Sequence, residues 1–214
     1  MPPVTPHTQP PGCPDMLALY RQRAAVYDLE LMPFEPLRFE AIDRLGLRPG
    51  DTVLDVGCGT GLSFALLQQA IGPQGTIIGI EPCPDMLSRA AQRAQRNGWG
   101  NVILLPACAA SADIPGQADA ALLHFTHDVM RQPEALTHLI AHLKPGAHVV
   151  ATGLKWADPW LWPVNAFVLS AALYSVSSLE GLDQPWSLLG PMLDGWQVNP
   201  TMLGGGYMGA GTVP

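Results

Sequence analysis

Charged side chains are scarce in this sequence. Asp, Glu, Lys and Arg make up 14% of its 214 residues, and the net charge is −7. Proteins that bind nucleic acid gain most of that affinity from clustered Lys and Arg. The one basic run, Arg89, Arg93 and Arg96, has helical spacing and predicts a solvated helix face. We therefore expect no nucleic-acid partner.

Cysteine is rare as well, and its positions form neither a Cys-x-x-Cys pair nor a zinc-ligand spacing. Isolated cysteines suggest a reducing compartment. The histidines form no metal constellation, and the proline-rich start contains no apolar stretch of signal-peptide length. The prediction is a cytoplasmic protein with no metal. The four cysteines are Cys13, Cys58, Cys83 and Cys108.

Long apolar runs are also missing. The most apolar late segment, Trp160 to Leu173, is interrupted by Pro163 and Asn165 and is too short to span a bilayer. It is still apolar enough to touch a membrane surface. Peripheral membrane contact therefore stays open, and nothing in the sequence indicates an oligomeric state.

The chain divides into four segments by composition and periodicity. Residues 1–14 contain six prolines and no periodicity, which predicts a loosely structured tail. Residues 15–46 predict a helical lid of two helices, the first over Asp15 to Tyr27 and the second ended by Gly46. Residues 47–155 alternate between strand and helix patterns, and residues 156–214 predict a cap followed by closing strands.

The alternation predicts an α/β, Rossmann-like fold with a mostly parallel twisted sheet and helices on both faces. It is accompanied by the N-terminal helical lid and a late, aromatic-rich helical insertion. Buried strands are predicted at residues 52–56, 76–80, 102–105, 118–124 and 147–153, with helices at 61–71, 84–97 and 133–143 and a turn at 144–146. Later predictions are an inserted helix or helix pair at 160–175, a crossover helix at 184–193 and a hairpin of 196–203 with 207–213.

A glycine-rich turn follows the first strand. Asp55 ends the strand, and Gly57, Gly59 and Gly61 follow at alternate positions before a helix, so backbone can approach a ligand closely. A dinucleotide fingerprint wants a small residue where Leu62 stands, and Asp55 would repel a pyrophosphate. An acid beside this turn favours a ligand with a cationic amino-acid end.

The heptapeptide from Asp55 to Gly61 resembles the first motif of the class I S-adenosylmethionine-dependent methyltransferases. Glu81 at the end of the second strand resembles the family's ribose-binding acid, and residues 143–146 resemble its turn before the fifth strand. Tyr27-Asp28 is similar to a pair in the small quinone- and phospholipid-type methyltransferases. The resemblance covers roughly residues 20–152 and implies S-adenosyl-L-methionine as cofactor, with S-adenosyl-L-homocysteine as product.

The resemblance also implies which residues contact the cofactor. One departure is Cys108, which stands where the family offers an acid to adenine, so backbone and apolar neighbours would hold the base instead. Asp55 and Glu81 have plainer interpretations as a turn cap and a surface acid, and Cys58 as a space-filler. The candidate set is Asp55, Gly57, Cys58, Gly59, Gly61, Glu81, Pro82, Met86, Ala107, Cys108, Ala109, His124, Tyr20 and Tyr27.

His124 and His127 follow the fourth strand, at the carboxyl edge where open α/β sheets bind ligands. Either could act as the catalytic base for a hydroxyl or amine acceptor. The plainer alternatives are that His124 borders the cofactor and that His127 is a loop residue. Aromatic residues of the late segment are candidates for acceptor contact, with core packing of the cap as the alternative. Candidates for acceptor contact are Tyr27, His127, Trp156, Trp160, Trp162, Tyr174 and Trp186.

The sequence therefore predicts methyl transfer from S-adenosylmethionine to a small-molecule or lipid-like acceptor through an oxygen or nitrogen nucleophile. Two alternatives stay open. One is a non-catalytic member of the fold that binds a metabolite or a protein partner. The other is an NAD(P)-dependent oxidoreductase, against which Leu62 and Asp55 argue.

Overall fold

A computed structural model describes residues 32–176 and 178–214. The predicted tail at residues 1–14 and the first lid helix, with Tyr20 and Tyr27, lie outside the described residues. The second lid helix is present as α3, Glu35–Arg44, with Pro36 in its first turn and Gly46 beyond its end at φ +60°. A short 3₁₀ turn, η1 (Met32–Phe34), precedes it.

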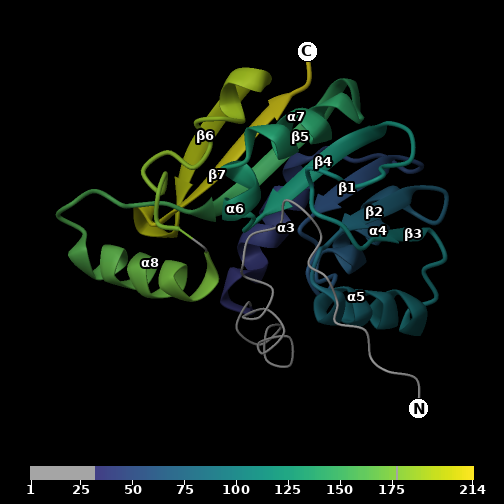
Figure 1. The fold of residues 1–214 in the computed structure, drawn as a ribbon, viewed down its shortest axis with the longest axis horizontal. Helices are drawn as coiled ribbons and strands as arrows, with labels where there is room; N and C mark the ends of the chain where they lie inside the picture. Colours follow the sequence, from purple (N-terminus) through teal and green to yellow (C-terminus); the bar gives the residue numbers. More distant parts are fainter. Residues whose placement is uncertain (1–31, 177) are drawn as a thin grey trace.

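The described residues form one seven-stranded sheet with the order β3-β2-β1-β4-β5-β7-β6 (Figure 1). The parallel strands are β1 (Thr52–Val56), β2 (Thr76–Ile80), β3 (Val102–Leu105), β4 (Ala118–His124) and β5 (Leu143–Leu154). The antiparallel pair β6 (Asp194–Thr201) and β7 (Gly206–Thr212) closes one edge, and β7 pairs with β5. The predicted Rossmann-like fold is confirmed.

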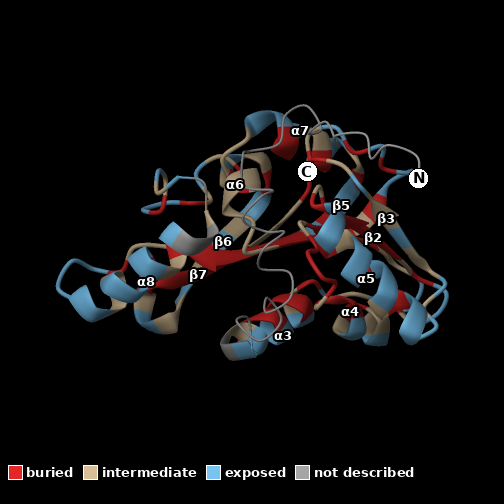
Figure 2. Ribbon diagram, turned by 60° about the horizontal axis from the view of Figure 1, so that its bottom comes forward, coloured by how far each residue is buried: buried red, intermediate tan, exposed pale blue. Residues whose placement is uncertain are grey.

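Apolar side chains on both faces bury the central strands. In β1, Leu54 contributes to one core cluster and its neighbour Val53 to the other, because successive side chains of a strand point to opposite faces. On one face lie α3, α4 (Phe64–Ile71) and α5 (Pro84–Arg96); on the other lie α6 (His127–Met130) and α7 (Pro133–Ala141) (Figure 2). The sequence predicted α4 three residues too early, since residues 59–63 form turns.

The predicted turn at residues 144–146 is wrong. Strand β5 begins at Leu143, which pairs with Ala118, and the register shifts before Ala120 pairs with His148. Gly146, at φ +78°, donates its backbone N–H to Val213 O at 2.8 Å. Pairing on both sides therefore extends the strand through a Pro-Gly pair, which the local sequence alone marks as a turn.

The late segment contains one helix, α8 (Trp162–Ser175), which stands off the sheet in Figure 1. It packs through Val168 and Ala172 on Leu154 and Leu182, a cluster separate from the two main cores. The predicted crossover helix at 184–193 is wrong, because these residues form turns and the short 3₁₀ helix η2 (Gly190–Met192). The predicted closing hairpin is present as β6 and β7, joined by η3 (Met202–Gly204).

Candidate functional site

The glycine turn between β1 and α4 has the geometry that glycine alone adopts without strain. Gly57 and Gly61 have φ of +65° and +76°. A Cβ added at Gly57 would meet Thr126 Cγ2 at 2.7 Å, and one at Gly61 would meet the Phe64 ring at 2.6 Å. The turn therefore packs tightly against Phe64 and against the loop that follows β4, and residues 58–61 are buried at the carboxyl edge of the sheet.

Glu81 joins the end of β2 to this turn. Its Oε2 accepts from Gly59 N at 3.0 Å, and its Oε1 accepts from Cys83 N at 2.8 Å. The side chain is buried, and burial raises its pKa to about 7, although both backbone hydrogen bonds oppose the rise. Each oxygen keeps a further lone pair, so the carboxylate can accept from a ligand's hydroxyls while it fixes the turn.

Asp55 lies at the end of β1 with 2% of its surface exposed. Burial raises its pKa to about 7; the Arg38 guanidinium lowers the pKa and the Glu81 carboxylate raises it. Its Oδ2 is buried without a hydrogen-bond partner among the described residues. An unpaired buried carboxylate oxygen is costly, so this geometry suits a group that a cationic ligand would complete.

Arg38 is a site residue that we did not predict from the sequence. It is 1% exposed, forms an ion pair with Glu35, and its Nε has no hydrogen-bond partner in the described part of the chain. The periodicity of α3 could have indicated it, since Arg38 is three residues before Ala41 and seven before Leu45, both of which face the core. A buried guanidinium beside Asp55 is a ready anion-binding group.

His124 ends β4 on the same edge as Asp55. Its Nδ1 and Thr152 Oγ1 share a hydrogen bond of 2.7 Å, while its Nε2 is buried and has no partner in residues 32–176 or 178–214. Burial and the charge of Arg38 lower its pKa to about 3, so the imidazole is neutral at physiological pH. Of the two histidines proposed as a base, this one has a ring nitrogen that is open to a new hydrogen bond.

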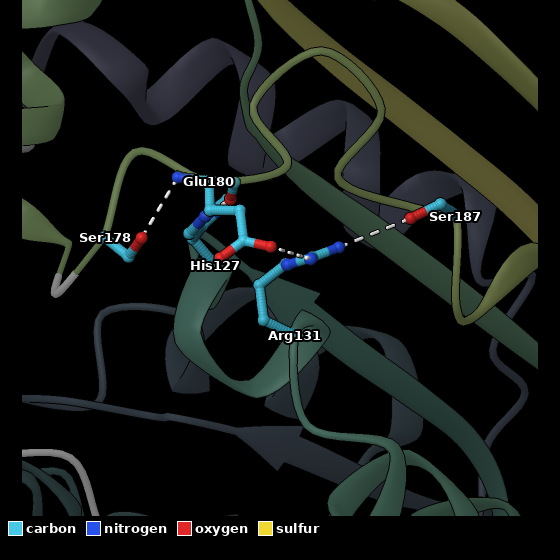
Figure 3. A network of polar contacts seen from close by, with 5 residues as sticks. All are labelled: His127, Arg131, Ser178, Glu180 and Ser187. Atoms are coloured by element: carbon cyan, nitrogen blue, oxygen red, sulfur yellow. Dashed lines mark hydrogen bonds and ion pairs between the residues drawn. The ribbon is translucent and has the colours of Figure 1, made fainter.

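His127 belongs to a polar network that ties α6 to the loop after α8 (Figure 3). Its Nε2 lies 3.1 Å from Glu180 O, and burial lowers its pKa. Arg131 bridges the Glu180 carboxylate and Ser187 Oγ at 3.4 and 3.5 Å, and Ser178 Oγ accepts from Glu180 N. His127 is thus engaged in positioning this loop.

The proposed adenine-side residues lie along the β2 and β3 end of the edge. Met86, Cys108 and Ala109 are buried, while Pro82 and Ala107 are partly exposed. Cys58 and Cys83 are buried free thiols, but Cys108 is not a free thiol. The expectation of isolated cysteines therefore fails at Cys108, and the cysteine pattern no longer supports a reducing compartment.

The aromatic candidates for acceptor contact separate in space. Trp186 packs on Tyr207 with ring centroids 5.0 Å apart, next to the main core. Trp156 packs against the cap cluster formed by Leu154, Val168, Ala172 and Leu182. Trp160 and Trp162 are 74% and 72% exposed, at the start of α8. Tyr174 is in α8, and its side chain lies outside the described structure.

Four buried polar atoms near the glycine turn therefore have no partner in the described part of the chain: Asp55 Oδ2, Arg38 Nε, His124 Nε2 and Thr126 Oγ1. The first three offer an acid, a cation and an imidazole nitrogen beside the buried turn. This set fits a nucleoside ligand that carries an amino-acid end, whose ammonium and carboxylate complement an acid and a guanidinium. Among the described residues no group of three or more His, Cys, Asp or Glu could hold a metal ion.

Comparison with known proteins matches this geometry to one family. The family model described as "Methyltransferase domain" matches residues 53–146, from β1 to β5. The 2-phytyl-1,4-naphtoquinone methyltransferase of Trichormus variabilis is 27% identical over 84% of this chain and 82% of its own length. These matches support the predicted resemblance to the class I S-adenosylmethionine-dependent methyltransferases. They also support the predicted cofactor, S-adenosyl-L-methionine.

The fold comparison agrees with this family. The crystal structure of the N-methyltransferase NodS from Bradyrhizobium japonicum, in complex with S-adenosyl-L-homocysteine, covers 94% of this chain and all of that one, with a TM-score of 0.68 at 17% identity. The protein-L-isoaspartate O-methyltransferase of Ignicoccus hospitalis is 34% identical over 51% of this chain and 50% of its own length. The chain spans half or less of the length of several curated relatives.

Proposed function

We propose that this protein transfers the methyl group of S-adenosylmethionine to a small-molecule or lipid-like acceptor through an oxygen or nitrogen nucleophile. One observation carries the proposal. Asp55, Arg38 and His124 place three unpartnered buried polar atoms, within the described residues, beside the glycine turn at the carboxyl edge of the sheet. Such atoms are rare in a structural core and are expected where a ligand completes them.

Each end of the donor has a matching group in this site. Asp55 would hold the ammonium and Arg38 the carboxylate of its amino-acid end. Glu81 would accept from the ribose hydroxyls with the lone pairs that Gly59 N and Cys83 N leave free. Met86 and the backbone from Ala107 to Ala109 would border the base.

Bound S-adenosylmethionine supplies an electrophilic methyl group on a sulfonium. In-line displacement at that carbon then requires the protein to align the acceptor, exclude water and manage one proton. His124 Nε2 would hydrogen-bond the acceptor's hydroxyl or amine, and the interaction with Thr152 fixes the ring. With a pKa of about 3, His124 orients the acceptor better than it removes its proton.

The acceptor class is supported by charge and by one relative. The net charge of −7 does not favour a nucleic acid. The relative from Trichormus variabilis is named for methylation of a phytylated naphthoquinone, which is a neutral ring with an apolar tail. These observations support a small-molecule or lipid-like acceptor.

Contact with a membrane surface is part of this proposal. Trp160, Trp162 and Leu173, at or within α8, are 65–74% exposed, and no charged residue occurs from 159 to 179. Within the described ranges no helix is long and apolar enough to cross a membrane. An uncharged helix with exposed Trp and Leu suits the interface of a neutral bilayer.

The experiment is a transfer assay with S-adenosylmethionine labelled in its methyl group, against neutral phenols, quinols, aliphatic amines and phospholipids. The wild type should label one acceptor class, and Arg38→Met should lose at least about tenfold in kcat/KM because a buried ionic contact to the donor is gone. Phe39→Ala, on the exposed face of the same helix, is the matched control.

Label in none of these classes, from a protein that binds S-adenosylhomocysteine, would favour the non-catalytic alternative. Binding of NAD in its place would favour the oxidoreductase alternative, and a shift in melting temperature with each ligand separates the two.

A further inference from the structure

A cavity of about 440 Å³ lies between the start of α3, the helix α8 and the β6–β7 connection. The described residues that line it are Phe34, Pro36, Leu37, Glu40, Phe167, Thr201 and Met202. This volume is in the range of sites that hold drug-sized molecules. The cavity does not include Asp55 or Glu81, so it is separate from the residues proposed to hold the donor.

A row of aromatic rings connects this cavity with His124. The ring centroid of Phe125 lies 4.8 Å from that of His124 and 4.9 Å from that of Phe34, and Phe34 lies 6.5 Å from Phe167. The row begins at the unpartnered Nε2 of His124 and ends in the cavity wall. The rings are in contact with one another, so a continuous series of aromatic contacts links His124 with the cavity wall.

Phe125 occupies the centre of the row in an unusual backbone conformation. Its φ is +57°, a region that bulky residues rarely adopt and that costs of order 1–3 kcal/mol. Its N–H donates to Thr152 O at 2.9 Å, and Thr152 also contacts His124. The surrounding structure thus holds this ring against both its neighbours, and strain of this kind is concentrated at ligand-binding positions.

The electrostatics of the cavity favour an uncharged occupant. Glu40 is its one charged side chain among the described residues, and Glu40 Oε1 already accepts from Arg44 Nη2 at 2.9 Å. Phe34, Leu37, Phe167 and Met202 supply apolar walls. A carboxylate or phosphate on the occupant would lose its hydration and gain no cation in return.

We propose that this cavity binds the apolar, uncharged ring body of the methyl acceptor, with the nucleophile at the His124 end of the aromatic row. The inference rests on the proposed function and specifies the acceptor class. It excludes acceptors whose body carries an anionic group. The cavity is the specificity-determining part of the site, while Asp55, Arg38 and Glu81 serve the donor.

The test uses two fluorescent probes that share one ring system. N-phenyl-1-naphthylamine is neutral, and 1-anilinonaphthalene-8-sulfonate adds a single anionic group. We expect the neutral probe to bind at one site per chain, at least about tenfold more tightly than the sulfonate, because the described residues of the walls include no cation. Phe167→Ala should weaken neutral-probe binding about fivefold through lost ring contact.

Two matched variants separate the cavity from other apolar surface. Phe39→Ala removes an exposed ring from α3, and Leu173→Ala removes an exposed side chain from α8, neither of which lines the cavity. Both should bind the neutral probe as the wild type does. Saturating S-adenosylhomocysteine should leave the probe bound, since the donor site is separate.

Four results would each overturn the inference. They are no binding of the neutral probe, equal affinity for the two probes, an equal loss of binding in Leu173→Ala and Phe167→Ala, and displacement of the probe by S-adenosylhomocysteine. Titration of S-adenosylhomocysteine alone reports separately on the proposed function. If that ligand fails to bind while the probe binds as expected, methyl transfer is refuted and the neutral apolar character of the cavity stands.

Discussion

Asp55, which we propose binds the donor, lowers the stability of the folded protein near neutral pH. Burial raises its pKa from 3.8 to about 7, so the folded protein binds this proton more tightly than the unfolded chain does. The contribution of Asp55 to the free energy of unfolding therefore falls as pH rises from about 4 to about 7, and stays low above that. An acid that is buried although its ionised form lowers stability indicates a role other than stabilising the fold.

Replacing this acid should stabilise the protein without ligand. We expect Asp55→Asn to raise the melting temperature by a few degrees at about pH 8, because the ionised form is no longer buried. Asp43→Asn, at an exposed position of α3, should leave it unchanged. Scanning calorimetry measures both, and a lower melting temperature for Asp55→Asn would contradict the assigned environment.

The carboxylates of Asp55 and Glu81 together predict a pH dependence for donor binding. Asp55 and Glu81 both have a pKa raised to about 7 by burial, so each becomes protonated below neutral pH. The affinity for S-adenosylhomocysteine should fall below about pH 7 by about tenfold per pH unit for each acid whose charge is needed, hence about a hundredfold for both, and level off above it. Calorimetric titrations between about pH 8 and pH 5.5 measure this, with circular dichroism to confirm folding. An unchanged dissociation constant would show that neither acid needs its charge.

Sequence reasoning identified some of these residues and missed others for physical reasons. Asp55, the turn glycines and Glu81 are consecutive features of two strand ends, so their spacing is visible in the chain. Arg38 comes from a helix that is remote in sequence, and an arginine in an amphipathic pattern is normally solvated. Its spacing from Ala41 and Leu45 places it on the core-facing side of α3, and packing against the sheet buries it.

At the scale of elements, the closing hairpin depends on one aromatic ring that covers glycines. Trp196 of β6 lies over Gly209 of β7, where an added Cβ would meet the ring at 2.2 Å. A Cβ added at Gly211 would meet the same ring at 3.1 Å. The glycine-rich strand is therefore stabilised by cross-strand contact with a tryptophan.

Gly209→Ala should destabilise the protein by about 2 kcal/mol, because the new methyl group forces either the ring or β7 to move. Gly100→Ala is the control, since its Cβ would meet nothing within 4 Å and its φ is not positive. Urea denaturation of both variants measures the difference. Equal stability would show that Trp196 moves aside at no cost.

The accuracy of the predicted elements follows from how local their signals are. β2, β3 and β4 have their predicted bounds because their apolar runs end at a polar residue or a proline. The turn at 144–146 and the helix at 184–193 were wrong because pairing with β4 and β7 and packing of Trp186 on Tyr207 overrode local preference. Strand pairing and ring packing act between segments that are distant in sequence, so local sequence patterns do not predict them.

At the scale of the whole molecule, the charge distribution and α8 predict how the protein meets a lipid surface. The net charge is −7, so an anionic bilayer repels it, whereas exposed Trp and Leu favour a neutral one. We expect sedimentation with phosphatidylcholine vesicles, reduced at least about threefold in Trp162→Ser combined with Leu173→Ser. Phe39→Ser, which removes an exposed ring from α3, is the control. Equal sedimentation of the wild type, the double variant and Phe39→Ser would show that α8 does not contact the bilayer.

The central claim is that the glycine turn, at the carboxyl edge of the sheet, holds a methyl donor with an amino-acid end. One titration tests this claim most directly. Calorimetry at about pH 8 should show one S-adenosylhomocysteine per chain and no heat with NAD. Asp55→Asn, folded and at least as stable as the wild type, should bind at least about tenfold more weakly because the charge that faces the ammonium is gone. Undiminished binding by Asp55→Asn, or binding of NAD in place of S-adenosylhomocysteine, would contradict the claim.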